Sequence, residues 1–168
     1  MMTATRIDRG STDSTTIYSV DGDLTYEREF DAPRELVWRA HTEPDLIARW
    51  FGPRRHKTRV EEMDVRVGGK WRFVSTDDDG NEFVFYGEYL ELVPPEKITW
   101  TFMFDVEGVG PQGGPETMTL EDLGGRTRFR AVSHMGSAEA IDAALATGMT
   151  QGAIETWDRL DEVLSSLR

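Results

Sequence analysis

The sequence predicts an α+β fold in which a strongly curved antiparallel sheet of about seven strands grips one long C-terminal helix. Two patterns support this fold class. Over residues 137–168, apolar side chains recur at spacings of three and four, which marks one face of an amphipathic helix. Between residues 57 and 134 the apolar period is two and the connections are short, which is typical of antiparallel strands. A helix of that length spans about 45 Å, so it needs the large surface that such a sheet supplies.

Before the sheet, the chain has a polar start, one strand and two short helices. Residues 1–16 are rich in Thr, Ser, Asp and Gly, and we expect a flexible tail there, followed by a single domain over 17–168. Alternating apolar and polar side chains predict the first strand at 24–30. Two short helices follow, with Pro33 and Pro44 near their first turns, where proline is well tolerated.

Six further strands complete the predicted sheet. Their ranges are 57–64, 70–76, 82–92, 97–104, 116–122 and 127–134. The turns between them contain Gly68-Gly69, Asp79-Gly80, Pro94-Pro95 and Gly124-Gly125. An Asp-Gly pair favours a two-residue hairpin loop. Short connections of this kind make neighbours in the sequence antiparallel neighbours in the sheet.

Composition excludes several classes of function. The 168 residues include 31 acidic and 19 basic side chains, for a net charge of -12, which disfavours nucleic acid or an anionic membrane as a partner. The chain has no cysteine, so it has no disulfide framework, thiolate metal site or cysteine nucleophile. No run approaches the length of a membrane span and no apolar signal segment begins the chain. We therefore expect a cytoplasmic protein without membrane insertion.

Two motifs resemble ligand-binding sequences but stand in the wrong context. Residues 108–113 have the Gly-x-Gly-x-x-Gly spacing of dinucleotide-binding loops. In such loops a helix follows and its N-terminus binds the phosphates, whereas here a strand follows. We expect a mobile loop there, over the mouth of a pocket. Residues 77–82 resemble a calcium loop, but Glu82 stands where that loop needs glycine, so a hairpin turn explains them.

No ligand spacing connects the three histidines, His41, His56 and His134. The sequence predicts neither a metal nor a cofactor.

Five blocks of the sequence, taken in order, resemble a known family. They lie at residues 30–38, 42–53, 64–73, 87–98 and 125–129. The first reads Phe-Asp-Ala-Pro-Arg-Glu-Leu-Val-Trp, and the second ends in Ala-Arg-Trp-Phe-Gly-Pro. The pattern is similar to that of the activator of Hsp90 ATPase homologue 1-like family, within the START-like (SRPBCC, Bet v 1-like) helix-grip superfamily. Members commonly place a Trp directly after the glycine that aligns with Gly152, whereas this chain has Ala153 there and Trp157 one turn later.

The resemblance implies a cavity between the curved sheet and the long helix. In that superfamily such cavities hold lipids, sterols, polyketides and other apolar ligands. The residues expected to line the cavity are Trp71, Phe73, Tyr86, Glu88, Trp100, Phe102, Met118, Phe129, His134 and Met149. The alternative is that these large side chains simply fill the core, because protein interiors normally pack without voids.

The sequence leaves open which face of strand 82–92 is inward, because the strand is apolar on both faces. Pairing through the two-residue turn puts Phe73 beside Tyr86 and points Phe85 the other way. A bulge at Gly87 would reconcile the two faces. A second buried surface, such as a homodimer contact, would do so as well.

Three functions remain. We favour non-catalytic binding of a hydrophobic or aromatic small molecule. The second is an enzyme of the polyketide cyclase, dehydratase or hydrolase type that uses one acid-base residue, for which Tyr86, Glu88 and His134 are the candidates. Glu88 has this role only if its face is inward, where burial would raise its pKa; on the outer face it is a solvated strand residue. The third, a partner of an Hsp90 homologue, is least favoured, because the domain stands here without the extra N-terminal domain of the eukaryotic activators.

Overall fold

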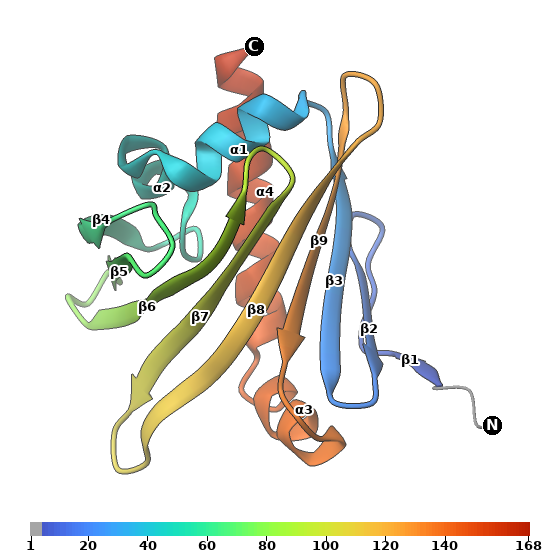
Figure 1. Cartoon of the computed structure of the whole chain (residues 1–168). Helices are drawn as coiled ribbons and strands as arrows, with labels where there is room; N and C mark the ends of the chain where they lie inside the picture. Colours follow the sequence, from blue (N-terminus) through green and yellow to red (C-terminus); the bar gives the residue numbers. More distant parts are fainter. Residues whose placement is uncertain (1–4) are drawn as a thin grey trace.

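A single nine-stranded sheet wraps around the helices in the part of the chain that the computed structural model describes, residues 5–168 (Figure 1). The strands are β1 (Arg6–Asp8), β2 (Thr16–Val20), β3 (Asp23–Phe30), β4 (Lys57–Met63), β5 (Lys70–Thr76), β6 (Glu82–Val93), β7 (Lys97–Val106), β8 (Gly110–Asp122) and β9 (Thr127–His134). The helices are α1 (Arg34–Thr42), α2 (Pro44–Trp50), α3 (Ala138–Leu145) and α4 (Met149–Leu167). All neighbours are antiparallel, in the order β1-β2-β3-β9-β8-β7-β6-β5-β4. The predicted fold class is confirmed, with nine strands rather than about seven.

The two additional strands lie in and beside the expected tail. β2 pairs with β3 across a tight turn at Asp21 and Gly22, and β1 pairs with β2. Ile17 and Ser19 of β2 are buried. Residues 6–8 and 16 of the expected tail therefore belong to the sheet, whereas flexibility elsewhere in the tail stays a prediction. Residues 1–4 lie outside the described part of the chain.

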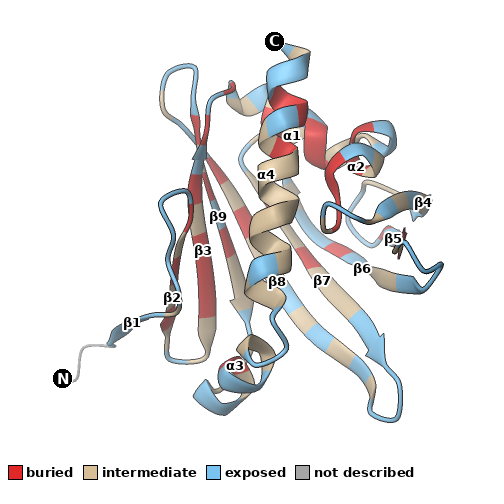
Figure 2. Ribbon diagram, turned by 180° about the vertical axis from the view of Figure 1, so that it is seen from behind, coloured by how far each residue is buried: buried red, intermediate tan, exposed pale blue. Residues whose placement is uncertain are grey.

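The predicted C-terminal helix is two helices, α3 and α4. The break falls at Gly148, whose φ of 82° is the left-handed conformation that favours glycine. α4 alone lies along the concave face of the sheet, while α3 covers its end beside β2 and β3 (Figures 1 and 2). The apolar stripe of the sequence continues through the break, so its spacing could not reveal it.

The core lies between the concave face of the sheet and the helices α1, α2 and α4, where the buried residues gather in Figure 2. It contains large side chains from all of these layers, among them Phe30, Ile47, Trp71, Phe129 and Leu160. A smaller cluster under α3 joins Ile17, Leu24, Tyr26 and Ile141. The two short helices were predicted, and together with α4 they close one end of the concave face.

The length of the turn before β6 determines which of its side chains point toward the concave face. Residues 77–81 form the loop, and Phe73 pairs with Phe85, one residue away from the predicted pairing with Tyr86. Phe85 is therefore inward and Tyr86 is outward. The register shift against β7 falls between Tyr89 and Glu91 rather than at Gly87. A homodimer contact at this strand stays a prediction.

The predicted mobile loop at residues 108–113 is mostly strand. β8 begins at Gly110, and residues 110–114 pair with residues 102–106 of β7. The β7–β8 hairpin therefore reaches the lower edge of the molecule, as α3 does (Figure 1).

Candidate functional site

A carboxylate stands on the concave face of the sheet, at the centre of one row of side chains. Glu116 of β8 pairs directly with Trp100 of β7 on one side and with Ser133 of β9 on the other. The Trp100 indole N–H donates to Glu116 Oε1 at 2.9 Å, and the Ser133 hydroxyl donates to Oε2 at 3.2 Å. Burial raises the pKa of Glu116, while these two hydrogen bonds and the nearby His134 act in the opposite direction. Two neighbouring strands thus hold a half-buried acid in place.

Two further polar groups approach this carboxylate from β3 and α4. The hydroxyl of Tyr26 and the Oγ1 atom of Thr150 are buried, and neither has a hydrogen-bond partner among the described residues. Burial raises the pKa of the Tyr26 phenol; the Thr150 hydroxyl lowers it and the Glu116 carboxylate raises it further. Trp157 of α4 packs edge-on against Tyr26, with ring centres 5.1 Å apart. The space beside Glu116 is therefore bordered by aromatic rings and by unpaired hydroxyls.

Over β5, β6 and β7 the concave face is solidly packed with aromatic rings. Trp71 stacks on Trp100 with ring centres 4.4 Å apart. Phe51, which follows α2, inserts against Phe73 at 5.0 Å and against Phe85 at 5.4 Å. These rings fill the region that the sequence analysis assigns to a cavity. They form core at this end of the sheet, in agreement with the alternative interpretation.

Arg159 of α4 bonds to the segment that carries Phe51. Its guanidinium donates to five backbone carbonyls, those of residues 49, 51, 52, 53 and 56. The shortest of these bonds reaches Gly52 O at 2.9 Å. Arg159 thereby satisfies the carbonyls that follow the end of α2 and fixes Phe51 over the sheet.

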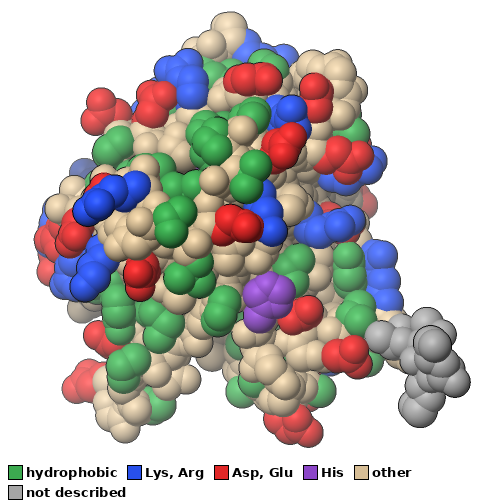
Figure 3. Space-filling view, viewed as in Figure 1, with side chains coloured by type: hydrophobic (Ala, Val, Ile, Leu, Met, Phe, Trp, Pro, Cys, Tyr) green, Lys and Arg blue, Asp and Glu red, His purple; other side chains and the backbone are tan. Residues whose placement is uncertain are grey.

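Toward the β7–β8 hairpin, β8 carries no large apolar side chain on this face. The next cross-strand pair is Phe102, whose ring is 5.6 Å from those of Trp71 and Phe85, and Gly114, which has no side chain. The middle of α4, including Trp157, is only partly buried (Figure 2). Figure 3 shows a notch in the lower edge of the molecule, between the β7–β8 hairpin and α3. Glu116 thus lies between the aromatic core over β5 to β7 and the part of β8 that leads to this notch.

The ten predicted site residues fall into three groups. Six lie on the concave face: Trp71, Phe73, Trp100, Phe102, Met118 and Phe129. Met149 begins α4 and packs on the small cluster under α3. Tyr86, Glu88 and His134 lie on the outer face, so the expectation that they line the cavity is wrong.

The outward residues have partners there. The Tyr86 hydroxyl donates to Asp105 at 2.7 Å, and Glu88 is exposed. The His134 ring is 3.0 Å from Asp23 and 3.3 Å from Thr117. Their facing follows from the one-residue register shift in β6 and, for His134, from its place on the same side of β9 as the exposed Arg130.

Sequence reasoning did not find Glu116, Tyr26 or Ser133. A signal was present for Glu116, because it alternates with Met118 and Leu120 and so shares their inward face. The interaction with Ser133 depends on the pairing of β8 with β9 across the Gly124-Gly125 turn, which was predicted. Among residues 5–168, no three carboxylate or imidazole side chains are grouped as metal ligands would be. The same residues contain no helix that is both long and apolar enough to span a membrane.

A curved antiparallel sheet closed by two short helices and a C-terminal helix defines a START-like helix-grip domain. The chain belongs to the family described as Activator of Hsp90 ATPase homolog 1-like protein, whose model matches residues 31–165. A comparison with curated proteins finds no match.

Solved structures agree with this assignment. A protein from Rhodobacter sphaeroides is 25% identical, with a TM-score of 0.82 over 92% of this chain and 99% of that chain. A protein from Arthrobacter aurescens is 27% identical, with a TM-score of 0.80 over 87% of each chain. The protein Ms6760 from Mycobacterium smegmatis is 27% identical, with a TM-score of 0.78 over 88% of this chain and 94% of that chain.

Proposed function

We propose that the protein binds a small apolar or aromatic molecule that carries a hydroxyl or amino group. The polar group bonds to Glu116, and the apolar body lies in the notch against Phe102 and Trp157. The observation that carries the proposal is the inward-facing Glu116 carboxylate, held between Trp100 and Ser133 at the edge of an aromatic core. Pockets with apolar walls and a few fixed polar groups are typical of small-molecule sites.

The carboxylate has room for another donor. Two oxygens offer about four acceptor positions, and Trp100 and Ser133 occupy two of them. The unpaired hydroxyls of Tyr26 and Thr150 lie in the same region. START-like helix-grip domains often bind hydrophobic ligands, which supports the same function.

A thermal-shift screen with matched ligand pairs tests the proposal. The pairs are aromatic molecules with and without one hydroxyl or amino group, for example a naphthol and naphthalene. We expect the members with the donor to raise the melting temperature of the wild-type protein more than their partners do. In Glu116→Gln we expect about tenfold weaker binding, as charged hydrogen bonds contribute on the order of 1.5–3 kcal/mol.

The matched control is Glu88→Gln, which removes the same charge from the outer face two strands away. It should bind like the wild type. If no member of the panel shifts the melting temperature, or if both variants lose binding equally, the proposal is wrong.

A catalytic alternative rests on the same carboxylate. Tyr86, Glu88 and His134 cannot act in the concave space from the outer face, whereas the raised pKa of Glu116 suits a proton-transfer residue. Turnover of a polyketide-like or ester substrate that is lost in Glu116→Gln and retained in Glu88→Gln would favour an enzyme over a binding protein.

A further inference from the structure

A second recess lies outside the concave face, between α2, the start of β4 and α4. Its volume is about 400 Å³ and it is broadly open to solvent. Its polar lining comes from Arg49, His56, Lys57, Thr58, Arg159 and Glu162. We call it the α2–α4 pocket. None of its lining residues belongs to the Glu116 row, so the two sites are separate.

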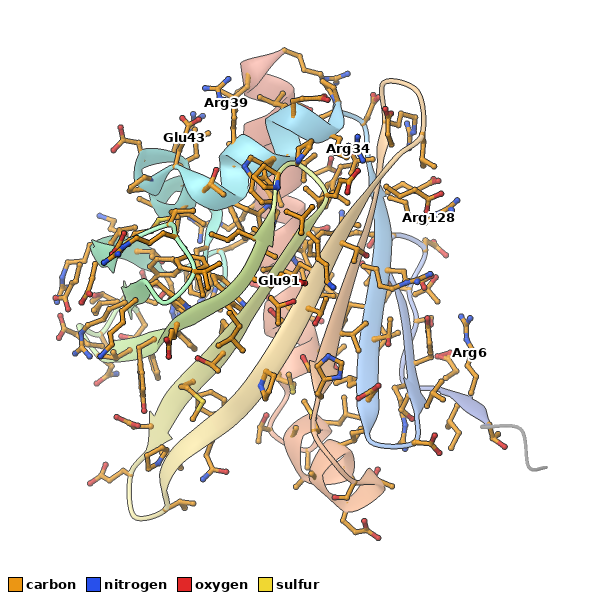
Figure 4. The ribbon with its side chains drawn as sticks, viewed as in Figure 1. Arg6, Arg34, Arg39, Glu43, Glu91 and Arg128 are labelled. Atoms are coloured by element: carbon orange, nitrogen blue, oxygen red, sulfur yellow. The ribbon has the colours of Figure 1, made fainter. Side chains whose placement is uncertain are left out.

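The α2–α4 pocket gathers basic side chains that have no acidic partner. Acidic residues outnumber basic ones in this chain by 31 to 19, and most arginines on its surface form ion pairs. Examples are Arg39 with Glu43 and Arg128 with Glu29 and Glu121; Arg39, Glu43 and Arg128 lie on the outside of the molecule (Figure 4).

By contrast, among the described residues no carboxylate oxygen lies within 4.0 Å of the charged nitrogens of Arg49, Lys57 or Arg159. Three uncompensated cations therefore meet in one recess of an otherwise acidic protein. Such an arrangement attracts an anion.

The acidic member of the pocket is already neutralised. Glu162 forms two hydrogen bonds with Arg54, each of 3.0 Å, and this pair lowers the pKa of Glu162. A carboxylate held bidentately by one arginine has few acceptor positions left for Arg49 or Lys57, although its charge still acts on Arg159.

Donors remain available in the pocket. Arg49 donates through Nη2 to Ser166 at 2.9 Å and, within residues 5–168, makes no other side-chain hydrogen bond. Lys57 Nζ makes none in that range either. The Nδ1 atom of His56 is buried and unpaired, and its ring stacks on Phe83 with ring centres 5.2 Å apart. Arg159 donates to backbone carbonyls, so it contributes mainly its charge.

We propose that the α2–α4 pocket binds the phosphate group of a small organic phosphate. Arg49 and Lys57 donate to the phosphate oxygens, and Arg159 behind them supplies fixed positive charge. Arginine and lysine both suit phosphate, arginine as a planar fork and lysine as a point charge. The recess is larger than a phosphate ion, which leaves room for a small organic group.

The test uses inorganic phosphate and glycerol phosphate as probes on the full chain, with amide chemical shifts followed by NMR and chloride used to keep the ionic strength constant. We expect saturable shifts at residues 48–58 and 159–163, with glycerol phosphate binding more tightly than phosphate. Lys57→Ala and Arg49→Gln should each weaken binding at least tenfold. Both side chains are away from the core, so the fold, checked by circular dichroism, should be unchanged.

The control is Lys70→Ala, which removes an exposed lysine at the start of β5. It should bind phosphate like the wild type. Shifts that do not saturate, or an equal loss of binding in Lys70→Ala, would mean diffuse attraction and would overturn the proposal. Acetate binding as tightly as phosphate would overturn the assignment to organic phosphates.

Discussion

Trp100 and Glu116 face each other directly across β7 and β8, and the indole N–H of one donates to the carboxylate of the other at 2.9 Å. The same indole stacks on Trp71. One side chain therefore connects the packed aromatic core to the acid that borders the notch. Because a strand pair fixes both ends of this bond, the carboxylate is held in place before any ligand arrives.

Glu116 is expected to make the protein less stable as the pH rises. Its folded-state pKa is raised above the unfolded value of 4.5, so the unfolded chain ionises first and ionisation favours unfolding. Its contribution to stability is greatest below about pH 4.5 and falls as the pH rises toward the folded-state pKa. Relative to Glu116→Gln, the wild type should lose stability over that window, measured by urea denaturation at several pH values. A constant difference between the two proteins would contradict this.

His41 is expected to make the protein sensitive to acid. Burial lowers its pKa from 6.5 to about 4, against the effect of its 2.8 Å hydrogen bond to Val37 O. The unfolded chain takes up a proton as the pH falls below 6.5, whereas the folded protein does not until about pH 4. Stability is therefore lost between these values, by about 3 kcal/mol at most.

The variant His41→Leu removes this titration. Denaturant midpoints measured from pH 7 to pH 4 should fall less steeply for His41→Leu than for the wild type. Because His41 packs between Trp50 and Phe129, the variant also changes the stability at pH 7. The slope, and not the absolute value, is the informative quantity, and equal slopes would show that another group causes the acid sensitivity.

Gly87 should not tolerate a side chain. A Cβ there would overlap the carbonyl oxygen of Thr101 and come within 2.7 Å of Trp71 Nε1. Gly87→Ala should lower the free energy of unfolding by about 3 kcal/mol, because the backbone of β7 must shift. Gly114→Ala is the control, since its Cβ would only meet His134 O at 3.7 Å. Equal midpoints of urea unfolding for the two variants would show that the sheet adapts at Gly87.

Arg159 should be important for stability. In Arg159→Leu, five carbonyl oxygens lose their donor at once, and we expect a loss of about 3 kcal/mol in guanidinium denaturation. Arg54→Leu removes an arginine that makes only exposed contacts nearby, and its effect should be much smaller. If the two variants were equally stable, water would be replacing the arginine at these carbonyls.

Much of the fold could be predicted from the sequence, because turn residues and a period of two define most strands. The strands from β3 to β9 and the two short helices lie close to their predicted ranges, except that β8 begins six residues earlier than predicted. β2 was missed although its Asp21-Gly22 turn is a hairpin signal, since polar Thr and Ser residues around it resemble a tail. The helix break at Gly148 was not predictable from spacing, because Gly148 also fits a stripe of small residues along one side of a continuous helix.

The site was less predictable, since it depends on register. Asp77 accepts hydrogen bonds from the backbone N–H groups of Asp79 and Asn81, and these bonds organise a loop longer than the two-residue turn that Asp79-Gly80 suggests. One residue of difference exchanges the faces of Phe85 and Tyr86. The inward position of Glu116 was predictable from alternation. The start of β8 was not, because the composition of residues 108–113 is typical of a loop.

The five carbonyl bonds of Arg159 also bear on how the protein is made. During synthesis, residues 49–56 leave the ribosome long before residue 159 exists, so their carbonyl oxygens stay bonded to water until the last helix arrives. Phe51 cannot be held over the sheet before then. The nascent chain therefore acquires its finished aromatic interior only after α4 has been synthesised, and a ribosome stalled before α4 would carry an unfinished domain.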